Sequence, residues 1–521
     1  MKFTMMILAI VVYLGYMVYL GVKLSKKNKS SDDMYLGGRK LGPLVTAMSA
    51  EASDMSSWLL MGLPGVALIN GITYNGGFAE AVWTAVGLAV GTYINWLIVA
   101  KRIRVYSEKT KSTTIPAFLS DRFGDKAGFL TAVAAVVIIV FFVPYTASGF
   151  SAIGKLASTL FGVDYHAVMI VGSIILVAYT VMGGFLAASI TDLIQSVVMT
   201  IALFVVVCFG IESAGGMSNV VDKILEIPGI ESLEQYFSLT GTDGSYGFLP
   251  IVSTLAWGLG YFGMPHILLR FMAIEDKNKL KVSRRVASVW VTISMGIAIF
   301  IGVLGFAFVS ENGLILSDGF DSEKIVVYFA DAIGSLDSFG AIIAGIIIAG
   351  ILASIMSTAD SQLLAASSSV SENLIKRFVW KNMKDKTQMW LARVTILVIA
   401  AVAIVLAWDQ NSSVFRIVSF AWAGFGAAFG PIVLFALFWK RTNKWGALAG
   451  IISGGAMVFI WKFLVRPIGG AFDIYELLPA FIVSAIAIVA VSLLTPKPDK
   501  SIEDTFDAVV NGEVEEPIEA D

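Results

Sequence analysis

An acidic side chain, Asp54, lies inside an apolar stretch, residues 49–65, that is long enough to cross a membrane. A carboxylate near the centre of a bilayer costs about 2.5 to 3.5 kcal/mol on insertion scales, so it normally faces protein or a water-filled cavity. The same stretch contains serines, glycines and Pro64, which interrupt a helix. We therefore expect this segment to bind a ligand or an ion near Asp54.

Three hydroxyl residues of a later apolar stretch, Ser354, Ser357 and Thr358, are spaced i, i+3 and i+4 and so share one face of a helix. Hydroxyl oxygens and the carbonyl oxygens of an interrupted helix form a neutral oxygen cage, which suits a small alkali cation such as Na⁺. The same spacing is also typical of tight helix packing, or of hydroxyls bonded to the preceding turn. The residues alone leave these alternatives open.

A second interrupted stretch, residues 257–265, contains three glycines and a proline within nine residues. Freed backbone N–H groups can hold a carboxylate. Trp257 and Tyr261, at i and i+4 if the segment is helical, can cover a small ring and face an ammonium group. These features suit a small zwitterion, although aromatic residues at helical spacing more often belong to a packed core.

The elements that must position these residues are membrane-spanning helices. Hydrophobic residues make up 57% of the 521 residues and charged residues 15%, with a mean hydropathy of +0.80, which indicates an all-α polytopic membrane protein. The first stretch, residues 5–22, is interpreted as a retained helix rather than a signal peptide. We predict thirteen spans, with centres near residues 13, 56, 88, 138, 172, 201, 259, 295, 353, 398, 426, 455 and 484.

Basic residues fall on alternate connections between these spans. The basic connections are residues 23–40, 101–126, 270–285, 376–386 and 440–444, whereas connections 213–246 and 311–331 are acidic or neutral. The positive-inside rule puts the basic connections in the cytoplasm, the N-terminus outside and the C-terminus inside. The acidic tail, residues 496–521, is expected to be too short and too polar to fold.

The two interrupted spans are the second and the seventh, so each opens a unit of five spans. Because five is odd, the two units have opposite topology, which is the pattern of a secondary transporter with inverted repeats. The predicted divisions are residues 1–42, 43–212 (first repeat), 213–245 (external loop), 246–440 (second repeat), 441–495 and 496–521.

Several motifs together resemble the sodium/solute symporter family from about residue 33 to residue 495. They are the runs LGGRKLGP (36–43), SDMSSWLLMGLPG (53–65), WGLGYFGMPHILLRF (257–271), IMST (355–358) and AWAGFGAAFGP (421–431). Within that family the motifs are most similar to those of the proline carriers. The resemblance implies the LeuT-like fold of five plus five spans and sodium-coupled uptake of L-proline through the cell membrane.

The resemblance also implies roles for individual residues. Sodium would bind to backbone carbonyls of Ala52, Met55 and Ser354 and to the hydroxyls of Ser357 and Thr358, with Asp54 needed for coupling. Substrate positions are Ser56, Tyr145, Trp257, Tyr261 and Pro265, and Arg39 matches an arginine linked to coupling. A possible second sodium site would use Ser357, Asp360, Ser361 and Asp192. In the alternative, Asp192 is a helix cap and Asp360 bonds a neighbouring helix.

Other functions remain open at this point. Glu51 and Ser57 stand where relatives carry small residues, so another small amino acid, a betaine or a carboxylate would fit the same architecture. A transporter-like membrane sensor is a further alternative, although the chain extends only a short way past its last span. We find no nucleotide loop, nucleophile–base pair or metal cluster to indicate an enzyme. His166 and His266 are expected to pack, and the expected partners are a zwitterion, Na⁺ and lipid, with no nucleic acid.

Overall fold

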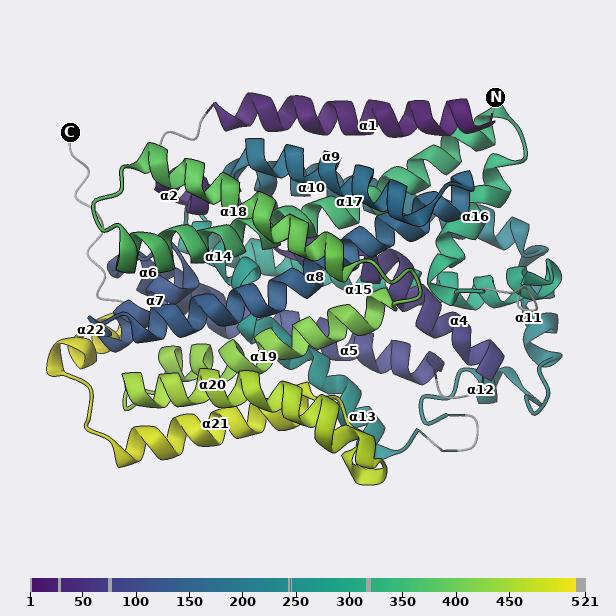
Figure 1. Ribbon diagram of the computed structural model, residues 1–521. Coiled ribbons are helices and arrows are strands. Elements are labelled where there is room, and N and C mark those ends of the chain that lie inside the picture. Colours follow the sequence, from purple (N-terminus) through teal and green to yellow (C-terminus); the bar gives the residue numbers. More distant parts are fainter. Residues whose placement is uncertain are drawn as a thin grey trace.

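The computed structural model describes residues 2–26, 30–73, 77–241, 244, 246–314 and 320–511. Within these ranges the chain is helical and has no strand; a single isolated bridge joins Leu41 and Ile274. The long helices lie side by side along one direction, and the short helices gather at the two ends of the bundle (Figure 1). The prediction of an all-α polytopic fold is confirmed.

The helices divide into long and short ones. The α-helices are α1 (Lys2–Ser25), α2 (Ser31–Leu36), α3 (Pro43–Asp54), α4 (Leu63–Thr73), α5 (Gly77–Ile94), α6 (Ala100–Lys109), α7 (Ile115–Phe123), α8 (Phe129–Phe161), α9 (Tyr165–Gly183), α10 (Phe185–Ser213), α11 (Gly216–Leu225), α12 (Leu233–Tyr236), α13 (Phe248–Leu255), α14 (Pro265–Ala273), α15 (Leu280–Glu311), α16 (Ile325–Gly334), α17 (Ser338–Ser368), α18 (Asp385–Leu406), α19 (Val414–Phe438), α20 (Lys444–Ile460), α21 (Leu477–Leu494) and α22 (Lys500–Asn511). The 3-10 helices are η1 (Gly37–Arg39), η4 (Ala256–Gly263), η5 (Lys277–Lys279), η7 (Ser322–Lys324), η10 (Arg466–Ile468) and η11 (Gly470–Phe472). The π-helices are η2 (Trp58–Gly62), η3 (Asn95–Val99), η8 (Ser369–Val379) and η9 (Trp461–Val465).

The number of spans is smaller than predicted. Among the described residues, eleven helices are long and apolar enough to cross a membrane, or twelve if the bent pair of α3 and η2–α4 counts as one span. The prediction of thirteen was therefore slightly too high. The difference lies in the seventh predicted span, which is divided into the apolar helix Phe248–Gly263 and the separate helix α14.

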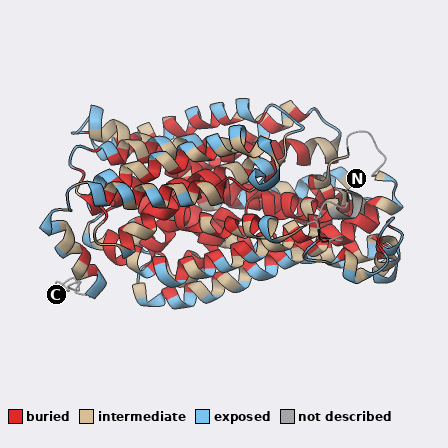
Figure 2. Ribbon diagram, turned by 90° about the horizontal axis from the view of Figure 1, so that it is seen from below, coloured by how far each residue is buried: buried red, intermediate tan, exposed pale blue. Residues whose placement is uncertain are grey.

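Buried residues fill the centre of the bundle along its whole length, and exposed residues lie on its outer helices and at its ends (Figure 2). Many of the exposed side chains on the outer helices are large and apolar, such as Val12, Val405 and Leu494. In water such a surface would aggregate, whereas in a bilayer it faces lipid tails. The chain is thus a multi-pass membrane protein.

The second predicted span is broken where the sequence indicated. α3 ends at Asp54, and Met55 (φ −74°, ψ 69°) leaves the helical region before η2 begins at Trp58. The two arms are bent by 61°. The Leu59 amide bonds the Ser56 carbonyl at 3.0 Å rather than the Met55 carbonyl. The Met55 carbonyl is therefore freed from the helical hydrogen-bond ladder.

The seventh predicted span is broken as well. Residues 256–263 form the 3-10 segment η4, Met264 is extended (φ −78°, ψ 107°), and α14 begins at Pro265. Proline suits the first position of a helix because its missing N–H would have no partner there. A Cβ on Gly258 would collide with the backbone of Gly87 on α5, so glycine is what permits these two segments to approach.

The two ends of the bundle differ in charge. All five basic connections lie at the end that carries α2, α6, α7 and α22, whereas α11, α12 and α16 lie at the other end (Figure 1). Lys2, at the start of α1, pairs at 2.7 Å with Asp331 of α16. The described chain therefore begins at the α11 end and reaches α22 at the opposite end.

The expectation that residues 496–521 do not fold is wrong for residues 500–511, which form α22; residues 512–521 lie outside the described part of the chain. Phe506 and Val509 are buried on one face of this helix. On its charged face, Lys440 pairs with Asp507, and its ammonium group lies 3.8 Å from Glu503. The sequence of α22 is thus amphipathic although its composition is acidic, and this pattern allows the segment to fold against the bundle.

The surface that receives α22 is centred on Arg122 of α7. This guanidinium is fully buried, donates from Nε to the Ala436 carbonyl at 2.8 Å, and lies 4.9 Å from the Phe506 ring. Carbonyls at the C-terminal end of α19 carry partial negative charge, which stabilises the buried cation. α22 therefore covers a buried charge that joins α7 to α19.

Candidate functional site

The hydroxyl face of α17 meets the end of α3. The Ser357 hydroxyl donates to the Ala52 carbonyl at 2.7 Å, and the Thr358 hydroxyl lies 3.4 Å from the same oxygen. The Ser357 hydroxyl also lies 3.2 Å from the Ser354 carbonyl. Four of the five oxygens that the resemblance assigned to sodium are therefore gathered at one place, all of them buried.

Met55 supplies the fifth assigned oxygen. Its carbonyl belongs to the break between α3 and η2 and lacks its helical partner, because the Leu59 amide bonds the Ser56 carbonyl. The five oxygens include no formal charge. A neutral set of hydroxyl and carbonyl oxygens suits an alkali cation, since it holds the ion by dipoles without a proton-binding group.

Asp54, the last residue of α3, is completely buried. One carboxylate oxygen, Oδ2, accepts a hydrogen bond from the Tyr261 hydroxyl at 2.6 Å. The other, Oδ1, has no hydrogen-bond partner among the described residues. The Asp54 carbonyl accepts from Trp58 Nε1 at 2.9 Å and from the Tyr145 hydroxyl at 3.3 Å. The backbone of this residue is thus held in place, while its side chain keeps one free acceptor.

The assigned substrate residues fall into two groups. Ser56 and Tyr145 line a small cavity that also touches Thr358, and Tyr261 bonds Asp54. Trp257 lies in an aromatic cluster, with ring centroids 5.2 Å from both Phe415 and Tyr475. Pro265 opens α14 beyond the second break. The structure therefore brings Ser56, Tyr145 and Tyr261 together around Asp54, with Trp257 at the edge of this region.

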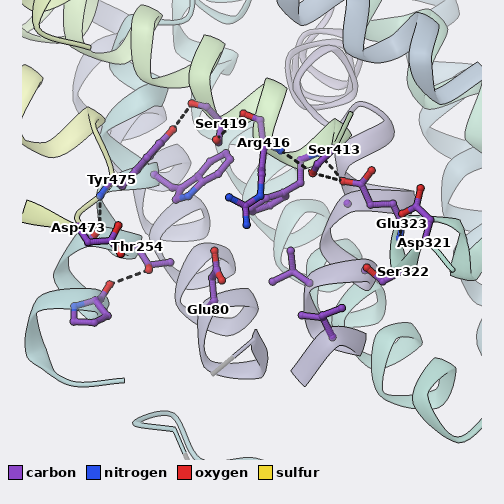
Figure 3. A pocket seen from close by; sticks show the side chains of 18 of the residues that line it. Glu80, Thr254, Asp321, Ser322, Glu323, Ser413, Arg416, Ser419, Asp473 and Tyr475 are labelled. Carbon is purple, nitrogen blue, oxygen red and sulfur yellow. Dashed lines mark hydrogen bonds between the residues drawn. The ribbon is translucent and has the colours of Figure 1, made fainter. Parts of the chain in front are cut away.

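A second and larger cavity, of about 540 Å³, is lined in part by Trp257. Figure 3 shows the Arg416 guanidinium and the Glu80 carboxylate pointing into it from α19 and α5. Its charged lining residues are Glu80, Lys155, Asp321, Glu323, Arg416, Arg466 and Asp473. We call it the charged cavity. Burial raises the pKa of the lining residue Tyr246 to about 12, so this phenol stays neutral near pH 7.

One edge of the charged cavity is tied together by Glu323. Its carboxylate accepts from the backbone amides of Val414 and Phe415, at 2.9 and 3.0 Å, and pairs with Lys155 at 2.9 Å. Lys155 is 2% exposed and also pairs with Asp321 at 2.8 Å. A carboxylate at a helix N-terminus is stabilised by the helix dipole. The segment η7 is thereby joined to both α8 and α19.

Two of the four residues of the possible second sodium site, Asp192 and Ser361, contact an arginine that sequence reasoning missed. Arg270 of α14 is 1% exposed, pairs with Asp192 at 3.2 Å, and donates to the Ser361 hydroxyl at 2.5 Å. Asp192 also accepts from the Ser49 hydroxyl at 2.6 Å. Asp192 is not a helix cap, because it lies well inside α10, whose N-terminal cap is Gly184. The available signal was an arginine in an apolar helix, which requires a partner.

Asp360 is turned toward a different helix. Its Oδ1 accepts a hydrogen bond from Thr180 of α9, and its Oδ2 has no partner among the described residues. Ser361, the next residue, donates to the Ser357 carbonyl at 3.0 Å. Three of the four assigned residues are therefore connected: Arg270 contacts both Asp192 and Ser361, and the Ser361 hydroxyl bonds the Ser357 carbonyl. The fourth, Asp360, bonds Thr180 of α9 instead.

Glu51, Ser57 and His266 are all buried. Glu51 accepts from Thr92 at 3.0 Å and from Trp96 at 2.7 Å, so it points toward α5 and η3. The His266 ring lies 5.5 Å from Phe142.

Arg39 lies at the α22 end of the bundle. It donates to the carbonyls of Met272 at 2.6 Å and of Ser107 and Ser112 at 2.9 Å. It therefore joins η1 to the ends of α6 and α14.

Comparison with known proteins gives a consistent result. Residues 34–454 match the model of the sodium:solute symporter family. The high-affinity proline transporter PutP of Bacillus subtilis (strain 168) is 42% identical over 495 residues, covering 95% of this chain and 98% of the relative. The sodium/proline symporter of Haemophilus influenzae is 41% identical over 498 residues, covering 95% and 96%.

Among solved structures, a Na⁺-coupled sialic acid symporter in a substrate-bound outward-open state has a TM-score of 0.76 at 19% identity, covering 95% of this chain and 99% of that one. This similarity concerns the fold. The LeuT-like arrangement expected from the motifs is therefore confirmed.

Proposed function

Because the chain belongs to the sodium:solute symporter family, we propose that it couples the inward movement of Na⁺ to the uptake of L-proline by alternating access. The support for proline comes from relatives named as proline transporters, which are 42% and 41% identical across 95% of the chain. The proposed activity is transport, with no covalent chemistry.

The observation that carries the proposal is the meeting of the α17 hydroxyls with the Ala52 carbonyl at a helix break, two residues before the buried Asp54. A break with freed carbonyls, facing hydroxyls on a neighbouring helix, is the arrangement that secondary transporters use for their coupling ion. The proposed ligands are the carbonyls of Ala52, Met55 and Ser354 and the hydroxyls of Ser357 and Thr358.

Sodium changes the contact between the two helices. The Ser357 hydroxyl donates its proton to the Ala52 carbonyl. A cation at these oxygens needs a lone pair from each of them, so the Ser357 hydroxyl proton would have to leave the Ala52 carbonyl. Ion–dipole attraction then holds α3 to α17 in place of the hydrogen bond. This exchange gives sodium a differential effect on the helix arrangement, which coupling requires.

The substrate contacts follow from the free groups near Asp54. Its Oδ1 is an available acceptor for the ammonium of a zwitterion. We propose that Ser56, Tyr145 and Tyr261 surround the substrate, with Trp257 and Pro265 completing the site toward the charged cavity. The charged cavity would then be the route by which the substrate arrives from outside.

Three further features belong to the proposal. The α22 end is assigned to the cytoplasm, because all five basic connections lie there. The N-terminus is then outside and the C-terminal segment inside. Residues 43–212 and 246–440 are taken as the inverted repeats.

Asp192, Asp360, Ser357 and Ser361 remain the proposed second sodium site. Arg270 already places a positive charge there, so a sodium ion would have to displace its guanidinium or share the Asp192 carboxylate with it.

The test is uptake of radiolabelled L-proline by purified protein in proteoliposomes. We expect accumulation above equilibrium with an inward Na⁺ gradient and none with an equal K⁺ gradient. The assigned sodium oxygens include no titratable group, so an inward proton gradient in sodium-free buffer should not replace sodium. Full accumulation under that condition would refute sodium coupling. In the Thr358→Ala variant, which alters one assigned sodium oxygen without touching Asp54, accumulation should require a higher sodium concentration.

A further inference from the structure

A glutamine lies one helical turn beyond the hydroxyls assigned to sodium. Gln362 follows Thr358 by four residues on α17 and therefore shares its face. It is 1% exposed. Its Oε1 accepts a hydrogen bond from the Thr146 hydroxyl of α8 at 3.1 Å, and its Nε2 has no hydrogen-bond partner among the described residues.

The small cavity gives that amide a function. Gln362 and Thr146 line it together with Ser56, Tyr145 and Thr358. It therefore touches one assigned sodium ligand and two assigned substrate residues. In this arrangement it is too small for an amino acid, so a substrate can occupy it only when the surrounding helices separate, as alternating access requires.

Asp54 and Gln362 offer an acceptor and a donor that together suit a zwitterion. Asp54, whose Oδ1 is a free acceptor, suits the ammonium group. An unpaired amide N–H inside a protein is unfavourable unless a partner completes it. The Thr146 hydrogen bond holds the amide oxygen, which leaves Nε2 as a donor and suits a carboxylate.

We propose that Gln362 is a substrate-binding residue whose Nε2 donates a hydrogen bond to the carboxylate of the transported amino acid. Thr146 is the positioning residue that orients the amide. This inference rests on the proposed function, because it assumes that the substrate is an amino acid such as L-proline. It predicts selection for a free carboxylate next to the amine.

The experiment compares L-proline with L-prolinamide, which keeps the ring and the ammonium but lacks the carboxylate. Uptake of L-proline and its competition by prolinamide are measured in proteoliposomes for wild type, Gln362→Met and Gln362→Glu. Methionine keeps most of the volume without a donor, and glutamate keeps the shape but replaces the donor by an acceptor. In both variants we expect the half-saturating proline concentration to rise at least tenfold. The preference for proline over prolinamide should shrink by a similar factor.

Ser367→Ala is the control, because this buried hydroxyl bonds the Leu364 carbonyl of its own helix and, among the described residues, no other helix. It should leave both quantities within twofold of wild type. If Gln362→Met fails to reach the membrane, Gln362→Glu decides. Unchanged proline affinity and unchanged preference in the glutamate variant overturn the inference. Failure of the wild-type chain to take up proline with sodium instead overturns the proposed function, so the two outcomes are distinguishable.

Discussion

Side-chain hydrogen bonds hold the backbone at both helix breaks, but close packing of glycines contributes more at the second break than at the first. At the first break, side chains hold the backbone: Trp58 and Tyr145 donate to the Asp54 carbonyl, and Ser357 donates to the Ala52 carbonyl. At the second break, Trp422 donates to the Trp257 carbonyl at 2.8 Å and Asn95 donates to the Tyr261 carbonyl at 3.0 Å, and three glycines pack closely against neighbouring helices as well. Added Cβ atoms there would meet the Gly87 carbonyl, the Trp422 indole and the Phe425 carbonyl, at positions 258, 260 and 263 respectively.

The two breaks therefore have different main roles. The first break presents oxygens and a carboxylate, so its hydrogen bonds can be exchanged for contacts with an ion or a substrate. The second break provides close packing against α5 and α19, which fixes where Tyr261 and Trp257 lie. Substitutions at the first break should therefore change binding, whereas replacement of the packed glycines of the second break should change whether the protein folds.

The largest effect is expected for Gly258→Ala. The new Cβ would lie against the backbone of α5, which no rotamer change can relieve. We expect loss of folded protein, measured as membrane yield and as a monodisperse peak on size exclusion. Gly296→Ala on α15, where no heavy atom lies within 4 Å of the added Cβ, is the control and should behave as wild type. A well-folded Gly258→Ala protein would contradict the packing role of the second break.

Asp54→Asn, in contrast to Gly258→Ala, should impair transport without impairing folding. The amide fits the same space and can still accept from Tyr261, but the negative charge is lost. We expect normal yield and a loss of sodium-driven proline uptake of at least a hundredfold, about 2.8 kcal/mol. Uptake and yield are measured on the same preparations. Uptake close to wild type would mean that the charge of this residue is not used.

Removal of one hydroxyl from the assigned sodium site should weaken sodium binding without lowering the yield of folded protein. For Thr358→Ala and for Ser357→Ala, we expect the sodium concentration for half-maximal uptake to rise about tenfold, or about 1.4 kcal/mol. By reciprocity, proline affinity should fall only at limiting sodium. Ser368→Ala, which removes a buried hydroxyl bonded to its own helix at Ala365, is the control. Identical sodium activation in all three variants would remove these residues from the sodium site.

Tyr261→Phe tests the link between the two breaks. It removes the hydroxyl that bonds Asp54 at 2.6 Å and keeps the ring. A hydrogen bond to a charged group contributes about 1.5 to 3 kcal/mol, so we expect proline affinity to fall by roughly ten- to a hundredfold at most. The readout is the half-saturating proline concentration at saturating sodium. No change would show that the two breaks act independently.

The smallest effect is expected for Glu51→Gln. Glu51 lies on α3 but faces Thr92 and Trp96, and a glutamine oxygen can accept both hydrogen bonds. Sodium activation and proline affinity should stay within about twofold of wild type, a difference below about 0.5 kcal/mol. A large change in sodium activation would show that the charge of Glu51 acts on the ion from a distance.

Features that depend on residues close together in the chain, such as a helix break or a shared helix face, could be predicted from the sequence. Glycines and Pro265 located the second break, because the effect of these residues on a helix is local. The first break falls instead at residues 55–57, and Gly62 and Pro64 lie inside the helical arm that follows it. The spacing of Ser354, Ser357 and Thr358 predicted a shared face, because helical periodicity is equally local. The partner of that face, the Ala52 carbonyl, came from the family resemblance, since spacing alone left helix packing equally open.

The sequence did not predict contacts between distant helices. Arg270 meets Asp192 across 78 residues, and Gln362 meets Thr146 across 216. Neither pair follows from periodicity. The helix α22 was missed because its acidic composition hid the spacing of Phe506 and Val509, which share one face. The count of spans was too high because a hydropathy pattern does not reveal that Met264 divides a span into two short helices.

The contact between Phe506 and Arg122 has a consequence for how the molecule is made. A ribosome adds roughly 5 to 20 residues per second, so residue 506 follows residue 122 by about 20 to 80 seconds. During that interval the guanidinium of Arg122 cannot have its final aromatic cover. This face of the molecule is therefore completed late in biosynthesis, long after the helices of the first break have been inserted.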